Sequence, residues 1–462
     1  MQVTPRHQSP IDPGLVPASL WTKAFLHECR RTPGSSVLTI GLARPDGTAS
    51  HFRTQVLPAN PGYAAANLWH VERTIKFLLW ARGGHQVSLC GPLAATLSPQ
   101  LQAIYSPNGG RAFDAEFCQK LFEQPLMFKA VPESELPPEC TSHLSLGRNL
   151  GGCRIGFDLG GSDRKCAAVI DGKVVFSEEV KWDPYFQPDP DYHLEGIKHS
   201  LKTAAAHLPR VDAIGGSAAG VYINNKVQAS SLFRGVTDAA VYDAKVRDIF
   251  LTVAQDWQVP FAVLNDGDVT ALAASMSLQR NAVLGIAMGT STAAGFVDPK
   301  GNLTNWLSEL AFVPIDYRDN APADEWSGDR GCGVQYFSQQ GVGRLLPLAG
   351  IHVPATMRLP EQLEELQKLM LAGDARAHQV YVAIGIAFGY ALAHFASFYD
   401  YQCLLIMGRV TSGQGGDIII QHARAVLADE FPELAIDLVV PSEKDKRHGQ
   451  AVAAATLPSL RA

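Results

Sequence analysis

The chain has 462 residues, of which 46% are hydrophobic and 18% are charged, and its mean hydropathy is near zero. These values describe an ordinary soluble globular protein, long enough for about two or three domains. The net charge of −6 gives no electrostatic reason to expect a nucleic-acid surface. The eight cysteines are scattered without a C-x-x-C pair, so neither a disulfide scaffold nor an intact cysteine zinc site is indicated.

Residues 1–17 are rich in proline and lack the apolar segment of a secretion signal. We expect a flexible or loosely docked tail there, and a cytoplasmic protein. The run 380–399 carries no formal charge and is long enough to cross a bilayer. Its alanines, glycines and His394 make it less hydrophobic than a typical span, so we expect a buried core helix and no membrane partner.

The region 1–148 is predicted to be a small accessory α/β unit. Two β-rich runs over 35–57 are joined by a Pro-Asp-Gly turn, which predicts a hairpin. An amphipathic helix follows over 64–84 and stops at a Gly-Gly pair. A strand is predicted over 85–92, and the proline-rich stretch 131–143 is typical of a linker.

Strands with glycine-rich connections dominate the chain after Gly151. Two related strand–loop units, at 154–170 and 283–297, suggest a duplicated architecture. The other predicted strands or strand–loop units lie within 212–223, 261–266 and 402–431, the last of these continuing into a helix.

The first of these units contains GFDLGGSDRK, residues 156–165. A turn without side chains lets backbone amides approach phosphate oxygens closely. This interpretation makes Asp158 a ligand for Mg²⁺, directly or through water. The phosphate-binding residues would be Gly160, Gly161, Ser162 and Lys165. The motif taken alone is equally compatible with a surface hairpin, and it matches neither the Rossmann fingerprint nor the P-loop.

The second unit carries another small-residue turn, with Gly289, Thr290 and Ser291 between apolar strands. Between the two units, the buried strand at 261–266 ends in Asn265-Asp266. A carboxylate at such a strand end, beside a phosphate site, is well placed to accept a proton from a substrate hydroxyl. The alternative is that Asp266 or Asp268 caps the helix predicted at 269–277. We expect capping for Asp268, while both interpretations remain open for Asp266.

The order of these motifs resembles the actin-like ATPase and sugar-kinase superfamily, and within it the ROK family of sugar kinases and related repressors, over residues 153–458. The resemblance implies that Asp266 is the catalytic base and Asn265 a sugar ligand. The stretch 215–222 resembles the family's glycine loop beside the sugar, which implies substrate contacts at Ser217 and Gly220. The stretch 404–419 resembles the adenosine motif, in which Gly408 and Gly413 would admit adenine and ribose.

The fold class implied by the resemblance is α/β, with two actin-like, ribonuclease H-like domains around a cleft. The first domain would span 149–266 and be completed by a C-terminal helix at 446–462, and the second would span 267–445. The implied activity is transfer of phosphate from ATP, with Mg²⁺, to a hydroxyl of a sugar or sugar-like polyol. The expected partner is that small molecule, with a homodimer possible and no nucleic acid.

The chain departs from the family pattern at the sugar end. In SELAF, residues 308–312, Glu309 matches a sugar-binding glutamate, but Phe312 replaces the histidine that contacts sugar and ligates a structural zinc. Glu325 and Ser327 occupy two of the zinc cysteine positions, so no structural zinc is expected. Val334 stands where a second sugar-binding glutamate is usual, so poor discrimination in favour of glucose is expected.

Two other functions remain as alternatives. ROK relatives include non-catalytic sugar sensors that regulate transcription, and those carry an N-terminal helix-turn-helix with a basic surface. The N-terminal region here is predicted as hairpin, helix and strand with nearly balanced charge, which favours an enzyme. An ATPase coupled to another process is the third possibility, and the sequence leaves the role of residues 1–150 open.

Overall fold

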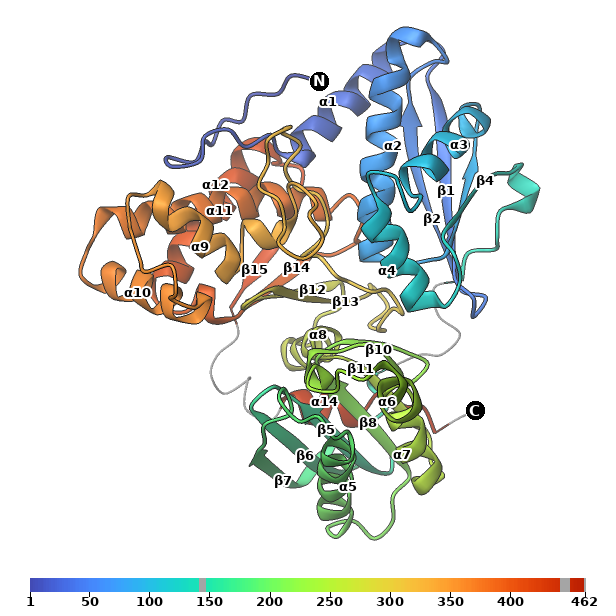
Figure 1. The fold of residues 1–462 in the computed structure, drawn as a ribbon, viewed down its shortest axis with the longest axis vertical. Coiled ribbons are helices and arrows are strands. Elements are labelled where there is room, and N and C mark those ends of the chain that lie inside the picture. Colours follow the sequence, from blue (N-terminus) through green and yellow to red (C-terminus); the bar gives the residue numbers. More distant parts are fainter. Residues whose placement is uncertain (141–146, 441–448, 461–462) are drawn as a thin grey trace.

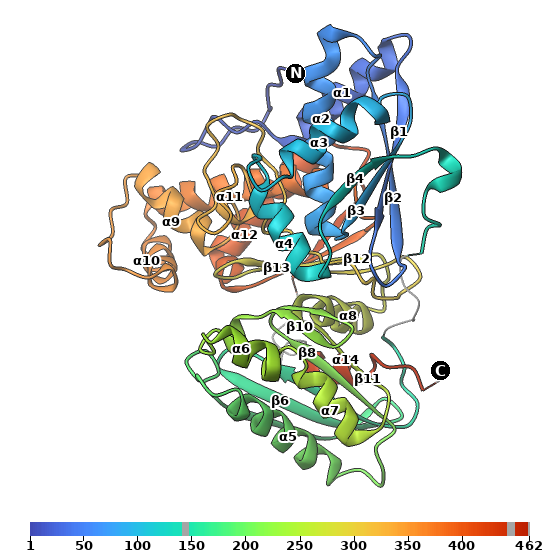
Figure 2. The same cartoon turned by 45° about the vertical axis from the view of Figure 1, so that its right-hand side comes forward.

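The computed structural model describes residues 1–140, 147–440 and 449–460. The chain forms three bodies, which can be followed by their colours in Figure 1. The N-terminal region (residues 1–140) is blue to cyan, and the first lobe (147–265, with the C-terminal helix α14) is green with red. The second lobe (266–440) runs from yellow-green to orange-red and lies beside the N-terminal region in both views (Figures 1 and 2).

The N-terminal region is a four-stranded sheet with helices packed beside it. The strand order is β2-β1-β3-β4, and β1 pairs with β2 as the predicted hairpin. Its strands are β1 (Ser36–Ala43), β2 (Ala49–Val56), β3 (Gln86–Cys90) and β4 (Met127–Ala130). Its helices are α1 (Ala18–Arg31), α2 (Pro61–Ala81), α3 (Ala94–Ile104) and α4 (Ala112–Phe122). The predicted hairpin, helix and strand are therefore confirmed, and three further helices accompany them.

The N-terminal tail is anchored, so the expectation of a loosely docked segment is wrong. Asp12 accepts hydrogen bonds from Arg318 at 2.6 Å and from Arg344 at 2.7 Å. The backbone N–H of Val16 donates to Asp316 at 3.0 Å. These arginines are mostly buried, so the ion pairs are shielded from solvent and hold the tail against the second lobe.

The first lobe is a five-stranded sheet in the order β11-β8-β5-β6-β7. Its strands are β5 (Cys153–Leu159), β6 (Asp163–Ile170), β7 (Lys173–Lys181), β8 (Ala213–Ala218) and β11 (Phe261–Asn265), with the small β9 (Val221–Ile223) and β10 (Lys226–Ala229) pair alongside. Its helices include α5 (Asp191–Ala205), α6 (Ala239–Val241) and α7 (Ile249–Trp257). Helix α14 (Gly449–Ala455) packs on β5 and β8, so the predicted closing helix is confirmed for its described residues.

The second lobe repeats this plan with a sheet in the order β13-β12-β14-β15. Its strands are β12 (Val283–Met288), β13 (Thr292–Val297), β14 (Cys403–Met407) and β15 (Asp437–Val439). Its helices are α8 (Asp266–Leu278), α9 (Gln339–Leu348), α10 (Leu359–Leu371), α11 (Ala375–Phe395) and α12 (Gln414–Glu430). In both lobes an antiparallel hairpin begins the sheet and later strands join it in parallel. The predicted duplication is therefore visible in the topology.

Helix α11 is buried along most of its length, as the sequence predicted. Nearly every side chain from Val380 to Phe395 is covered, including His394. No helix in the described ranges combines the length and the hydrophobicity that crossing a bilayer needs.

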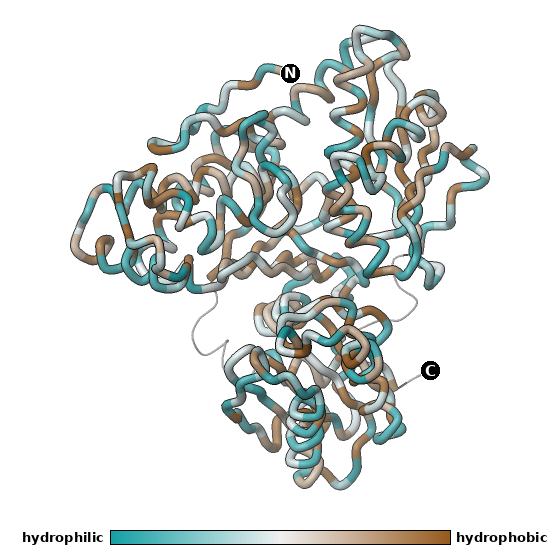
Figure 3. Tube along the Cα trace, viewed as in Figure 1, coloured by the Kyte–Doolittle hydropathy of each residue, from teal (hydrophilic) through white to brown (hydrophobic). Residues whose placement is uncertain are grey.

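The hydrophobic core is divided unevenly among the three bodies. One continuous cluster runs from Leu38 and Ile40 of β1, through α2 and α11, to Leu284 and Leu404 in the second-lobe sheet. The first lobe has its own cluster, and a third surrounds α8 and α14 between the lobes. Hydrophobic residues, brown in Figure 3, are distributed through all three bodies. The N-terminal region and the second lobe are therefore packed as one body.

Candidate functional site

The first glycine turn joins β5 to β6 and carries a buried carboxylate at its base. Asp158 of β5 is 5% exposed and accepts a hydrogen bond from the Ser217 hydroxyl at 2.6 Å. Its other oxygen lies 3.8 Å from Lys165 Nζ, which also pairs with Asp163 at 2.8 Å. Burial raises the pKa of Asp158. Ser217 is fully buried and its hydroxyl supports Asp158, while its predicted contact with substrate stays a prediction.

The same turn is braced by a loop whose contribution the sequence did not reveal. The indole N–H of Trp182 donates to Gly160 O at 2.8 Å. A Cβ at Gly161 would lie 2.0 Å from the Tyr185 hydroxyl oxygen, so only glycine fits at that position. The segment after β7 therefore fixes the shape of the first turn.

The second glycine turn joins β12 to β13 and exposes its backbone. Gly289 N donates to Ser291 O at 2.8 Å, and Gln339 N donates to Gly289 O at 2.9 Å. The Thr290 hydroxyl donates to the Gln339 side chain at 3.3 Å. A Cβ at Gly289 would meet nothing closer than 3.6 Å. The turn is thus open at Gly289, as expected of a phosphate-binding loop.

The predicted adenosine motif forms the connection from β14 to α12. Gly408 has φ +102°, and a Cβ there would lie 2.4 Å from Met288 O at the end of β12. Gly413 has φ +69° and open space around its missing Cβ. Both conformations favour glycine, and the open side at Gly413 leaves room for a ligand at the start of α12.

The carboxylate predicted as the base lies at the first residue of α8. Asn265 ends β11 and caps the helix, with its side-chain oxygen accepting from Gly267 N at 2.7 Å. Its side-chain N–H donates to Gly220 O at 2.7 Å. The expectation that Asp268 caps the helix is wrong, because α8 begins at Asp266 and Asp268 lies within its first turn.

The charge environment of Asp266 connects it to the first glycine turn. Burial and then the nearby charge of Asp158 raise the pKa of Asp266 to about 6. A like charge nearby disfavours the ionised form of a carboxyl group. Asp158 and Asp266 therefore share one electrostatic site.

A pocket of about 190 Å³ lies beside the start of α8, where the three bodies meet. The residues that line it include Arg44, Asp46, Gly220–Asn225, Phe261–Asn265, Asp268, Thr304–Leu307 and Glu309. Burial and then the charge of Asp266 raise the pKa of Glu309 to about 7. The structure thus brings together Asn265, Glu309 and Gly220, the predicted sugar contacts. It adds Arg44, Thr304 and Trp306, which the sequence motifs did not indicate.

A second pocket of about 260 Å³ lies on the other side of α8, under the β12–β13 hairpin. Asp266, Gly267, Thr270 and Gln450 contribute to its lining. The first turn of α8 therefore separates the two pockets. Asp266 borders the pocket of about 260 Å³ under the β12–β13 hairpin, and Asp268 borders the pocket of about 190 Å³ that contains Asn265 and Glu309.

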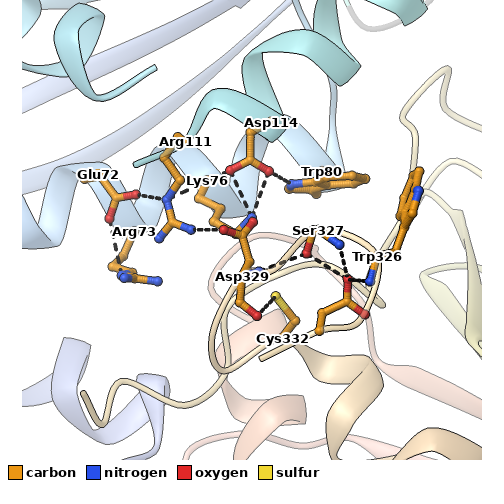
Figure 4. Close-up of polar contacts among 11 residues, drawn as sticks. Glu72, Arg73, Lys76, Trp80, Arg111, Asp114, Trp326, Ser327, Asp329 and Cys332 are labelled. Carbon is orange, nitrogen blue, oxygen red and sulfur yellow. Dashed lines mark hydrogen bonds and ion pairs between the residues drawn. The ribbon is translucent and has the colours of Figure 1, made fainter. Parts of the chain in front are cut away.

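The degenerate zinc positions Glu325 and Ser327 lie in the loop 324–332, part of which Figure 4 shows. Asp324 accepts from the backbone and hydroxyl of Ser327 at 2.7 and 2.8 Å. The Phe312 ring packs against Trp80 and Trp326, with centroid distances of 4.7 and 5.0 Å. Val334 is completely buried beside this loop, so it is a core residue.

Comparisons with known proteins identify the fold. No family model matches the chain, and no curated protein matches it by sequence. A ROK hexokinase from Thermus thermophilus superposes with a TM-score of 0.53 at 18% identity, covering 66% of this chain and 97% of that one. A putative N-acetylmannosamine kinase from Listeria monocytogenes gives 0.50 at 16% identity, covering 66% and 97%.

A third solved structure extends over more of the chain. It is a ROK family transcriptional regulator described as a homologue of the E. coli MLC protein. Its TM-score is 0.52 at 17% identity, and the superposition covers 84% of this chain and 96% of that one. The chain therefore has the fold of the ROK family, the fold that these kinases and this regulator share.

Proposed function

We propose that the protein transfers the γ-phosphoryl group of ATP to a hydroxyl of a sugar or sugar-like polyol. The observation that carries the proposal is the placement of Asp266. This buried carboxyl, with a pKa raised to about 6 by burial and the charge of Asp158, begins α8 directly after Asn265, which lines the neighbouring pocket together with Glu309. A general base is most effective when its pKa lies near the working pH, which suits this carboxyl to accept the proton of an acceptor hydroxyl.

The nucleotide would occupy the face formed by the two glycine turns. Backbone amides at Gly160–Ser162 and Gly289–Ser291 would donate to its phosphate oxygens. Gly408 and Gly413 would allow the adenosine to approach the β14–α12 connection. Asp158 would hold Mg²⁺, which neutralises charge on the phosphates when it is bound. The mutual repulsion of Asp158 and Asp266 supports a cation at this place.

The acceptor would lie in the pocket beside α8. Asn265 and Glu309 would orient its hydroxyls, and Asp266 would accept the proton as the oxygen attacks the phosphoryl group. Closure of the cleft would exclude water, which otherwise competes as phosphoryl acceptor.

The test is an ADP-release screen of the wild-type protein over hexoses, amino sugars, pentoses and cyclitols, followed by Asp266→Asn. We expect the variant to lose acceptor-dependent turnover about 10²- to 10⁴-fold while nucleotide binding is retained. Asp319→Asn, at an exposed aspartate, is the control and should match the wild type. Normal turnover by Asp266→Asn would refute the assignment of the base.

A sugar-responsive transcription regulator is the second candidate. It is favoured by one observation, that the superposed regulator covers 84% of the chain, more than the kinases do. Against it, the N-terminal region contains a four-stranded sheet and Asp158 and Asp266 are both present. Retention of the protein on DNA at low and high salt, together with sugar binding and no ADP release, would support the regulator. ADP release that needs no acceptor would indicate a coupled ATPase.

A further inference from the structure

The C-terminal end of α2 holds the backbone of the segment that carries Glu309. The last carbonyl groups of a helix have no partners within the helix. Here Ala81 O accepts from Ser308 N at 2.8 Å, and Trp80 O accepts from Glu309 N at 3.0 Å. Helix α2 therefore fixes the position of Glu309, although the two are far apart in the sequence.

The hairpin β1–β2 holds the preceding residues of the same segment. The Arg44 guanidinium donates to the backbone oxygens of Asn305 and Arg82. The Asn305 side chain donates to the Thr48 hydroxyl at 3.1 Å, and the Arg82 guanidinium lies 4.5 Å from the Trp306 ring centre. The pocket segment, defined as Thr304–Glu309, is thus held from several points of the N-terminal region.

A buried ionic cluster fixes the N-terminal region against the second lobe. Figure 4 shows Lys76 of α2 between Asp114 of α4 and Asp329 of the 324–332 loop. Arg111 bonds both Glu72 and Asp329 at 2.6 Å. Lys76 is completely buried, so these bonds are shielded from water and tie the two bodies together.

Three polar atoms beside the pocket lack partners. They are Asp268 Oδ1, Thr304 Oγ1 and Trp306 Nε1, which are buried and form no hydrogen bond among the described residues. Buried polar groups are rarely left unpaired, because the loss of hydration is not compensated. A ligand with several hydroxyl groups can both bond to Asp268 Oδ1 and accept from the indole N–H, so it would supply what this set lacks.

We propose that the N-terminal region is a working part of the acceptor site. Arg44 and the end of α2 position the pocket segment, and Thr304, Trp306 and Asp268 bind hydroxyl groups of the acceptor. This inference rests on the proposed function, since it assigns further binding residues to the same pocket. It gives residues 1–140 a role in acceptor binding.

The sharpest test is Thr304→Val, which removes a hydroxyl without removing any protein hydrogen bond. We expect the KM for the best acceptor to rise about 10-fold, while kcat, the KM for ATP and the Tm stay within error. Ser19→Ala removes another buried, unpartnered hydroxyl, on α1 and outside the pocket lining, and should leave all four values unchanged. An unchanged acceptor KM in Thr304→Val would overturn the binding role.

The positioning role is tested with Arg44→Met, Arg44→Lys and the control Arg53→Met, an exposed arginine of the same hairpin. We expect Arg44→Met to raise the acceptor KM and leave the KM for ATP unchanged, and Arg44→Lys to restore part of the affinity because its ammonium still donates to a carbonyl. Equal acceptor KM values in Arg44→Met and Arg53→Met would overturn this role.

The same variants also separate this inference from the proposed function. If the wild type binds a polyol of the screen without phosphorylating it, the proposed activity fails. The inference is then tested by calorimetry, which measures the affinity of the Thr304 and Arg44 variants for that polyol in place of KM. Polyol affinities that equal the wild-type value would overturn the inference, and so would a wild type that binds none of the polyols.

Discussion

Replacing Lys76 with methionine should destabilise the body formed by the N-terminal region and the second lobe. The cluster contains three cations, Arg73, Lys76 and Arg111, and three carboxylates, Glu72, Asp114 and Asp329. Although burial lowers the pKa of Lys76, the neighbouring carboxylates raise it above its usual value, so the ammonium is charged in the folded protein. Lys76→Met leaves three carboxylates facing two cations in a site closed to water.

The expected cost is about 3–5 kcal/mol, the usual range for breaking a buried ion pair by removing one partner. In the double variant Lys76→Met/Asp329→Asn, two cations face two carboxylates, so the charges are balanced again. The double variant should therefore be more stable than Lys76→Met alone, although the amide still has to satisfy Arg111. Comparing the two variants separates the free-energy cost of the uncompensated charge from the cost of the lost packing of Lys76.

Urea unfolding of the full chain, followed by tryptophan fluorescence, measures the effect. Trp80 is a local probe because its indole N–H donates to Asp114 at 2.6 Å. The first lobe has a separate core, so we expect its unfolding to be affected less than that of the composite body. A Lys76→Met midpoint equal to the wild-type value would refute the reasoning, and so would a double variant less stable than Lys76→Met.

Two further predictions concern the cleft and its support. Acceptor kcat/KM should fall as the pH drops through about 6, because burial and the charge of Asp158 raise the pKa of Asp266 to about that value. A general base must be ionised to accept a proton. A kcat/KM that does not change between pH 5 and 8 would contradict the prediction. Gly215→Ala would place a Cβ 1.7 Å from Ala454 O and push α14 off the first lobe. We expect the free energy of unfolding, measured by urea titration, to fall by about 1–3 kcal/mol or more. Gly110→Ala, at a position with open space around it, is the control and should leave the unfolding free energy unchanged.

Local signals in the sequence were sufficient for the strands and turns that build the cleft. A glycine pair between apolar runs predicted the β5–β6 hairpin, and a turn of small residues predicted the β12–β13 hairpin. Asn265-Asp266 at a strand end predicted the carboxylate between them. The cap was misassigned to Asp268 because asparagine and aspartate have similar capping preferences, and the boundary between β11 and α8 was predicted three residues late.

The rest of the pocket depends on contacts between residues that are far apart in the chain. Arg44 and Asn305 are separated by 261 positions, and Trp182, in the loop after β7, is 22 positions from Gly160 in the β5–β6 turn. A tryptophan or arginine in a loop has no periodicity that indicates its partner. The fold therefore could be inferred from local patterns and a family resemblance, while the composition of the pocket wall could not.

The division of the core suggests how the pocket would open and close. The N-terminal region shares a hydrophobic core and a buried ionic cluster with the second lobe, so these two bodies should move together. The N-terminal region also forms an ion pair with the first lobe, between Glu123 and Arg247 at 3.4 Å. The Glu123 side chain is largely exposed, so this pair should add little to the cost of moving the first lobe relative to the other two parts. Closure of the cleft would therefore bring Arg44 and Glu309, as one rigid wall, toward Gly220 and Asn265 on the opposite side. An acceptor that pairs with both walls would stabilise the closed form, because only that form satisfies all of its hydroxyl groups at once.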